Sequence, residues 1–410
     1  MITQKLNDQI SRIGPNTPAG AVHRQYWQPA ALLDEIEGDD PRLPVNLLGE
    51  RLVLMRDANT GSYILTQRVA SADEAPAHHP ARADIHFVED APIYPVVEKN
   101  GVLFAYLGGG EPPEFPNFDC FRAPDTHVFA FKGLWECNWL QALEIGIDPG
   151  HASFLHRFLQ DEDPQDSYGK QFRDKAANTD MPMTQVLREY PRPDIEVEET
   201  DFGLKITALR HMDNDLTHVR VTNQIFPSAI CIPMSREMII TQWHVPIDDE
   251  NCYWFTMFTS FEKPVDKDLM RAQRIKEHSL PTYAPLKNRN NSYHFNPEEQ
   301  KTLTYTGMGL DINVHDQWAV ESMGAIQDRT REHLGRGDAA IIRYRLMLRK
   351  AIKALASEHL ERLPMQDAHV TPKIIGPLSN DAIADSDDWA AASMQSDMTR
   401  RTDCPWDASV

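Results

Sequence analysis

The chain has 410 residues, with 41 Lys and Arg against 61 Asp and Glu, and a formal net charge of −20 at pH 7. This acidity argues against a nucleic-acid partner, because phosphate binding needs clustered basic side chains. Hydrophobic residues make up 41% of the chain, enough for a full core in one large or two ordinary domains. No uncharged apolar run approaches the roughly 18 residues that cross a bilayer, and the N-terminal residues lack a basic leader with an apolar core. We therefore expect no membrane segment.

The cysteines are odd in number and widely spaced. They stand at positions 120, 137, 231, 252 and 404, and no pair of them forms a CxxC motif. This spacing indicates neither a disulfide framework nor a zinc ribbon. A reducing compartment fits such a pattern best, and we expect a cytoplasmic protein.

Residues 1–45 are predicted to be an irregular lead-in, because several prolines interrupt any helix there. From residue 46 the pattern changes to short apolar runs that are mostly bounded by Gly, Asn or Asp. These runs predict a small antiparallel β module over residues 46–125. Its expected strands are 51–56, 62–66, 93–97 and 102–107.

The region 126–365 is predicted to be an α+β domain. Helix-like sequence around 135–158 precedes a series of strand-type runs, and Asp338 can cap a long amphipathic helix near the end. We expect that helix to pack on a curved antiparallel sheet. The expected strands are 195–197, 204–209, 218–225, 238–245 and 252–259. The basic residues expected on the solvated face of the helix are Arg343, Arg345, Arg349, Lys350 and Lys353.

Residues 366–410 are polar and aperiodic. We expect them to form a tail that either lies on a neighbouring chain or is disordered.

Four groups able to bind a metal or relay a proton lie within thirteen positions: Glu144, Asp148, His151 and His156. On an unbroken helix the two histidines would point roughly 140° apart, at about 100° per residue. Both can therefore meet one ion only if the helix ends or kinks between them. Asp148-Pro149 offers a break nearby, because it suits a helix N-cap followed by proline at the first helical position. A helix can therefore stop before Asp148 and restart there.

Two readings of this segment stay open from spacing alone. Asp148 can be a simple helix cap and the histidines ordinary polar residues at a helix end, because HxxxxH is a weak motif. In the second reading both histidines bind a metal. Two imidazoles do not complete a site, so a third ligand must come from elsewhere. A carboxylate there would give the 2-His-1-carboxylate set of non-haem iron(II) oxygenases.

Several longer motifs resemble the large-subunit family of Rieske non-haem iron aromatic-ring oxygenases, especially the phenoxybenzoate and phthalate type. The resemblance covers most of the chain. The motifs that carry it are Tyr26-Trp-Gln-Pro, Leu43-Pro-Val-Asn-Leu-Leu-Gly-Glu50, Tyr94-Pro-Val-Val-Glu98, Cys137-Asn-Trp-Leu-Gln-Ala-Leu-Glu144 and Asp328-Arg-Thr-Arg-Glu-His-Leu-Gly335.

The resemblance implies a mononuclear Fe(II) site with His151 and His156 as two ligands and Asp316 as the third. It also implies that Asp148 links the site to an external electron donor, and it places Glu144 as an acidic partner at the catalytic centre. The fold it implies for residues 126–365 is a helix-grip domain. The reaction it implies is attack of O2 on an aromatic substrate, with electrons from NAD(P)H through a separate reductase and ferredoxin.

The chain departs from that family in its N-terminal module. Members hold a two-iron, two-sulfur Rieske cluster with Cys-x-His and Cys-x-x-His, but no cysteine precedes position 120 here. Histidines 78, 79 and 86 occur in the corresponding loop, where we expect them to be solvated. The β module is thus read as a degenerate Rieske-like domain without a cluster.

Two functions follow from this departure. In the first, the chain binds iron and an aromatic substrate within a trimer-based hetero-oligomer, and a homologous Rieske-bearing subunit supplies electrons at Asp148. In the second, the chain is a catalytically silent structural subunit that completes such an assembly.

Overall fold

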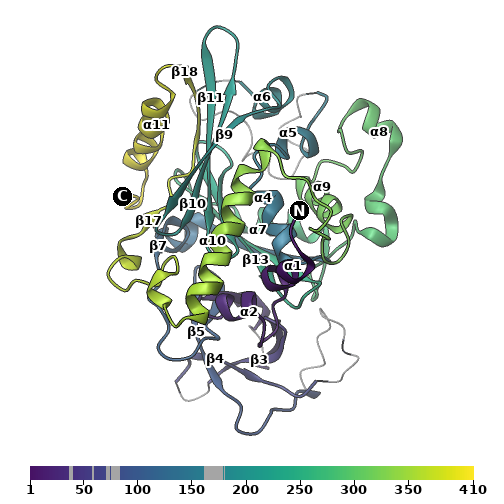
Figure 1. Ribbon diagram of the computed structural model, residues 1–410, viewed down its shortest axis with the longest axis vertical. Coiled ribbons are helices and arrows are strands. Elements are labelled where there is room, and N and C mark those ends of the chain that lie inside the picture. The colour runs from purple at the N-terminus through teal and green to yellow at the C-terminus, as the bar shows by residue number, and fades with distance from the viewer. Residues whose placement is uncertain (37–39, 58–59, 71–73, 75–83, 161–178, 180) are drawn as a thin grey trace.

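A computed structural model describes residues 1–36, 40–57, 60–70, 74, 84–160, 179 and 181–410, and its architecture consists of two antiparallel sheets with helices packed around them (Figure 1). The smaller sheet lies at one end of the molecule. The larger one forms the middle and the opposite end. A continuous hydrophobic cluster runs through both sheets, so the domain boundaries near 45, 125 and 365 remain predictions.

The smaller sheet has six strands in the order β1-β6-β5-β4-β3-β2. The four strands predicted for this module are confirmed as β3 to β6, and β1 and β2 were not predicted. The two added strands lie at the sheet's edges and contain Pro29 and Pro44, which edge positions tolerate because a ladder hydrogen bond is not lost there. The strands are β1 Gln28–Leu32, β2 Arg42–Leu47, β3 Glu50–Arg56, β4 Tyr63–Gln67, β5 Ile93–Lys99 and β6 Val102–Ala105.

The larger sheet runs in the order β8-β14-β13-β12-β11-β10-β9, and β18 adds to β11. Every residue of β14 is buried, whereas the edge strand β9 alternates exposed and half-buried residues. The predicted strands are confirmed; β8, β12 and β18 are additional. The bounds are β8 Val128–Trp135, β9 Asp194–Thr200, β10 Gly203–His211, β11 Leu216–Ile225, β12 Ala229–Pro233, β13 Met238–Pro246, β14 Cys252–Ser260 and β18 Asp381–Asp385.

The long helix predicted after Asp338 is α10 (Ala339–Ala356), and it lies across the larger sheet against β9 and β10 (Figure 1). The buried Tyr344 holds the helix in place along its axis, because its hydroxyl donates a hydrogen bond to the Pro227 carbonyl oxygen at 2.7 Å. This is the predicted α+β, helix-grip arrangement. One of the basic residues expected in solvent, Arg345, is instead buried.

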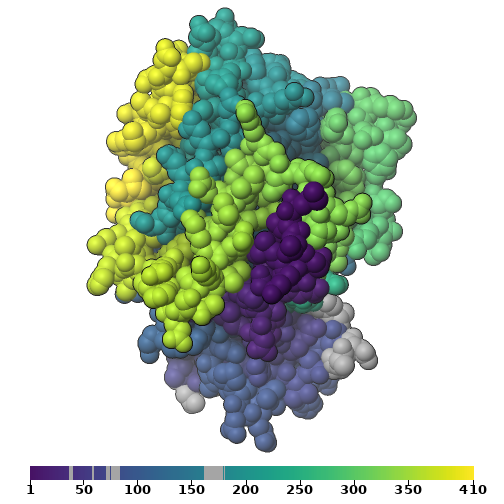
Figure 2. Space-filling model, viewed as in Figure 1, coloured from purple at the N-terminus to yellow at the C-terminus, as the bar shows by residue number. Residues whose placement is uncertain are grey.

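The N-terminal segment contains two short helices, α1 (Gln4–Ser11) and α2 (Pro18–His23), where an irregular lead-in was predicted. Thr3 and Thr17 cap them, and Pro18 occupies the first position of α2. Both helices contact α10, and Figure 2 shows the N-terminal residues seated against the C-terminal half of the chain. The lead-in prediction was wrong because Pro18, at the start of α2, was read as a helix breaker, and because α1 ends before the first proline of the chain.

The C-terminal residues are ordered on the chain itself, contrary to the prediction of a disordered tail or an arm on a neighbour. Residues 381–385 form β18, which pairs with β11, and α11 (Trp389–Asp403) packs on β18 (Figure 1). Arg401 fastens this segment by donating to Asp119 at 2.8 Å and to Asp397 at 2.6 Å. The polar composition misled the prediction because buried ion pairs replace part of an apolar interface.

The connecting segments carry the remaining helices. These are α3 (Asp119–Arg122), α4 (Trp139–Gly146), α5 (Ala152–Leu155), α6 (Met183–Glu189), α7 (Lys267–Ile275), α8 (Pro297–Thr302) and α9 (Ile312–Glu321). In the residues that the structure describes, no helix combines the length and the apolar character needed to span a membrane.

The Asp119–Arg401 pair gives a test of the C-terminal packing. We expect Asp119→Asn to lower the free energy of unfolding by about 3 kcal/mol, because it leaves a buried guanidinium short of its charge partner. Urea denaturation of wild type and variant measures this difference. As a control, Asp194→Asn removes the exposed partner of His211 and should leave stability nearly unchanged; equal effects of the two variants would contradict the packing described.

Candidate metal centre

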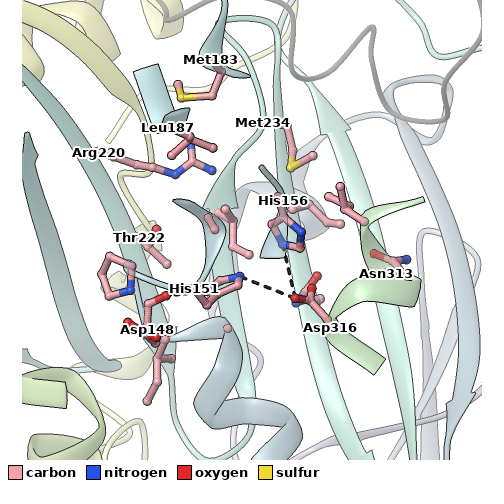
Figure 3. A pocket seen from close by; sticks show the side chains of 18 of the residues that line it. Asp148, His151, His156, Met183, Leu187, Arg220, Thr222, Met234, Asn313 and Asp316 are labelled. Carbon is pink, nitrogen blue, oxygen red and sulfur yellow. Dashed lines mark hydrogen bonds and ion pairs between the residues drawn. The ribbon is translucent and has the colours of Figure 1, made fainter. Parts of the chain in front are cut away.

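A deep cavity opens between the inner face of the larger sheet and the segments around α5, α6 and α9 (Figure 3). Its volume is about 1320 Å³, including the part open to solvent. Asp148, His151, His156 and Asp316 all line it. Three of the four groups that the sequence placed in one segment therefore share a cavity with the distant Asp316.

The two histidines flank a single helical turn. α4 ends at Gly146, and α5 spans only Ala152–Leu155, with His151 directly before it and His156 directly after it. Their rings meet edge-on, with centroids 5.1 Å apart and planes at 86°. The break predicted near Asp148-Pro149 is confirmed, because α4 ends at Gly146 and α5 begins only at Ala152. The residue at the N-cap of α5 is His151, not Asp148 as predicted, and the helix ends again at Leu155, directly before His156.

Asp316 approaches both histidines from α9. Its Oδ1 lies 3.3 Å from His156 Nε2 and 3.7 Å from His151 Nε2 (Figure 3). One ligand atom from each of the three side chains falls within 4.8 Å of the other two. The arrangement therefore has the donor set and the spacing for one divalent cation.

A backbone contact orients the His151 ring. Its Nδ1 donates a hydrogen bond to the Asp148 carbonyl oxygen, so Nε2 is the nitrogen that faces Asp316. A backbone carbonyl that orients the ring in this way is typical of metal-binding histidines.

Asp316 is held in a position that disfavours its negative charge. Burial raises its pKa to about 7, while nearby His151 lowers the pKa and Asp311 adds to the rise. Within the described part of the chain, its Oδ1 accepts no hydrogen bond. A cation between the three side chains would compensate the buried carboxylate, so the residues present fit a metal ion.

Contacts at both ends of α9 position Asp316. At the C-terminal end, Gln141 Nε2 donates to the Val320 and Gly324 carbonyls at 2.9 and 2.7 Å, which ties α9 to α4. At the N-terminal end, His315 Nε2 donates to the Gly309 carbonyl at 2.9 Å, and its ring stacks on that of His156. His315 was not singled out from the sequence, although it directly precedes Asp316 in the chain.

Asp148 lies half-buried at the wall of the cavity. Its Oδ1 accepts from the Gly150 backbone amide at 2.8 Å, which closes the turn that leads into His151. Asp148 thus shapes the ligand loop and also presents its carboxylate beside His151 (Figure 3).

Glu144 has a different place from the one predicted, because it does not line the cavity. Its carboxylate is buried and pairs with Arg329 at 2.9 Å and with Arg345 at 2.5 Å. Burial alone would raise the pKa of Glu144, but the two guanidinium groups outweigh it and lower the pKa below 4.5. A direct catalytic role is not supported by this position; the residue holds α4 to α10.

The N-terminal module contains a buried ion pair at the start of the loop that follows β4. Arg68 directly follows β4 and pairs with Glu74. It also donates to the Leu52 carbonyl at 3.1 Å and to Asn46 Oδ1 at 3.0 Å. Of the loop histidines, His86 is exposed as expected, and His78 and His79 lie outside the described residues.

A family model described as "LigXa C-terminal domain like" matches residues 105–403. The chain belongs to this family. It is 27% identical to the 3-chlorobenzoate-3,4-dioxygenase oxygenase subunit of Comamonas testosteroni, over 86% of this chain and 89% of that protein. It is also 27% identical to the phthalate 4,5-dioxygenase oxygenase subunit of Pseudomonas putida, over 86% of this chain and 87% of that protein. The resemblance to Rieske oxygenase subunits is thereby confirmed, with the cluster ligands missing.

Among solved structures, the terminal oxygenase of carbazole 1,9a-dioxygenase from Novosphingobium sp. KA1 matches with a TM-score of 0.46 and 16% identity. The match covers 83% of this chain and 93% of that one.

Glu144 gives a pH-dependent test of the ion pairs that hold α4 to α10. Because its pKa is lower folded than unfolded, its contribution to stability is present above pH 4.5 and is lost as the pH falls through the folded pKa. We expect Glu144→Gln to lower the free energy of unfolding at pH 7 by about 3 kcal/mol. The variant should also lose less stability than wild type on acidification below pH 4.5.

Chemical denaturation at a series of pH values measures both effects. Glu198→Gln, which alters an exposed carboxylate paired with Lys205, is the matched control and should follow the wild-type pH profile. Parallel profiles for wild type and Glu144→Gln would contradict the assignment of the pair as stabilising.

Proposed function

We propose that this chain is the iron- and substrate-binding subunit of a heteromeric oxygenase, and that it receives electrons from a Rieske cluster held by another subunit. The observation that carries the proposal is the combination of two features. His151, His156 and Asp316 converge on a cavity, and the chain has no cysteine before position 120 with which to hold a cluster. Its relatives named as dioxygenase oxygenase subunits support the same reaction class.

Each side chain has a defined task in this proposal. His151, His156 and Asp316 would hold Fe(II) on one side, leaving the side that faces the cavity open to substrate and oxygen. Bound iron supplies the activation of O2, which needs electrons delivered one at a time. The apolar walls of the cavity exclude water and orient an aromatic substrate. Asp148, beside His151, would face the histidine of a docked Rieske subunit and hold the partner in register.

The metal site can be tested on the purified chain alone. Under anaerobic conditions we expect one Fe(II) to bind per chain, and the visible spectrum of a Rieske cluster to be absent. Asp316→Ala should weaken Fe(II) binding by more than about 100-fold, the upper end of what losing an outer-shell partner costs. Isothermal titration calorimetry measures the change.

Asp148→Asn is the matched control for that titration, since its carboxylate shapes the loop without being a ligand in the proposal. It should retain Fe(II) binding within about tenfold. Recovery of a cluster from the chain, or equal Fe(II) affinity in wild type and Asp316→Ala, would overturn the assignment.

The heteromeric arrangement can be tested by reconstitution. The chain is co-purified from its native source with its partner subunit, and product formation is assayed with aromatic acids, NAD(P)H, a reductase and ferredoxin. We expect Asp316→Ala to abolish product. Asp148→Asn should slow turnover by about 10- to 100-fold while iron stays bound.

The same assay separates the two candidate functions. Unchanged activity of the complex with Asp316→Ala would show that the chain is a structural subunit, as in the second reading of the sequence. Exposed Asp213→Asn is the control for nonspecific effects of removing a carboxylate.

A further inference from the structure

A second cavity lies where the smaller sheet meets the larger one. It is lined by residues from β1 and β6, from the segment 113–121, from the connection between β11 and β12, and from the segment after α10. Its volume is about 520 Å³, including the part open to solvent, which is less than half that of the metal cavity. The proposed function makes no use of this second cavity.

The two cavities lie on opposite faces of the larger sheet. Successive side chains of a strand point to opposite faces. On β11, Arg220 and Thr222 line the metal cavity, whereas Ile225 lines the second one. On β13, Gln242 lines the metal cavity and the next residue, Trp243, lines the second one. The thickness of the sheet therefore separates a ligand in the second cavity from the metal site.

Aromatic rings from both sheets dominate the wall of the second cavity. Trp27 stacks on Phe115 with centroids 4.9 Å apart, and Phe104 meets Trp243 edge-on at 5.6 Å. The Trp27 ring is also fixed by a hydrogen bond, because its Nε1 donates to the Pro113 carbonyl at 2.7 Å. A rigid wall of this kind is complementary to a flat aromatic ring.

Two buried polar side chains in this wall carry an atom that lacks a partner. Gln28 and Ser228 are each 1% exposed, and both line the second cavity. Gln28 Nε2 donates to the His23 carbonyl at 2.9 Å, so Oε1 is the free acceptor. Among the residues that the structure describes, neither this atom nor Ser228 Oγ has a hydrogen-bond partner. Buried polar atoms are normally satisfied, so the cavity suits a ligand that supplies both a donor and an acceptor.

The charge of the wall disfavours an anionic ligand. Of the described residues that line the second cavity, only Glu114 is charged at pH 7, and it is exposed. A carboxylate placed there would lose its hydration without gaining a cationic partner. A hydroxyl group is neutral, and it can donate to Gln28 Oε1 while it accepts from Ser228 Oγ.

From these contacts we infer that the second cavity binds a neutral phenol, a single aromatic ring that carries a hydroxyl group. The ring packs among Trp27, Phe115 and Trp243, and the hydroxyl group satisfies Gln28 and Ser228. The inference is independent of the proposed function, because the second cavity contains none of the metal-binding residues.

Isothermal titration calorimetry on the full-length chain tests the inference. Phenol is the probe, and toluene, in which a methyl group replaces the hydroxyl, is its matched counterpart. We expect phenol to bind about tenfold or more tightly than toluene, as two neutral hydrogen bonds imply. Ser228→Ala should weaken phenol binding by about 3- to 10-fold and leave toluene binding unchanged. Gln28→Met should weaken phenol binding at least as much.

Three controls keep the test decisive. Thr222→Val removes a hydroxyl group that lines the metal cavity on the other face of β11, and it should bind phenol like wild type. Ser228→Ala deletes a single atom, so it carries the test even if Gln28→Met is poorly folded by circular dichroism. Protonated benzylamine, which probes whether the aromatic wall and Glu114 select a cation, should bind more weakly than phenol.

Failure of phenol to bind would overturn the inference and leave water as the partner of the two polar atoms. Equal affinity for phenol and toluene would overturn it as well, and so would tighter binding of benzylamine. A loss of phenol affinity in Thr222→Val as large as that in Ser228→Ala would place the phenol in the metal cavity and contradict the assignment of the site.

Discussion

The buried carboxylate of Glu144 is the contact on which the geometry of the cavity depends. It lies in the last turn of α4, just before the loop that carries Asp148 and His151, and it pairs with Arg345 of α10 and with Arg329. Arg329 in turn donates to Asn7 of α1 at 3.2 Å. Helices from the beginning, middle and end of the chain therefore meet at one charge cluster. This cluster holds the helix that leads into the histidine loop, through contacts that never touch a ligand.

The strands and the histidine pair could be predicted from the sequence because their signals are local. Alternating apolar residues marked most strands. The angle between positions 151 and 156 required a helix to end between them, and α5 ends at Leu155. Asp316 lies far away in the chain, so it could be named only by resemblance. Glu144 and Arg345 were misplaced for a related reason: both looked solvent-exposed or catalytic until the fold paired them with each other. Buried ion pairs leave no periodic pattern, and the same holds for Asp119 and Arg401 in the C-terminal segment.

The N-terminal module shows how a β fold can persist without the cluster that defines its relatives. Its sheet has six strands. Arg68 connects β2, β3 and the loop after β4, because it contacts Asn46, Leu52 and Glu74. In a cluster-bearing module, metal–ligand bonds fix the loops at the sheet's tip and contribute to folding. Here the described contacts that join these strands to the loop are made by a buried guanidinium with several acceptors. Electron storage has no such substitute, which is why the proposed function assigns it to another chain.

The pairing of β18 with β11 has a consequence for the evolution of ligand preference. β18 brings Asp381 to Arg220, so a strand near the C-terminus determines how much positive charge the cavity wall retains. A related chain that lacked this strand, or carried a neutral residue at its first position, would leave the Arg220 guanidinium without its carboxylate partner. The wall of such a cavity would carry more positive charge, although none of the side chains around the metal centre had changed. Selectivity for the charge of the ligand can thus diverge through the C-terminal segment while the residues proposed for the chemistry stay constant.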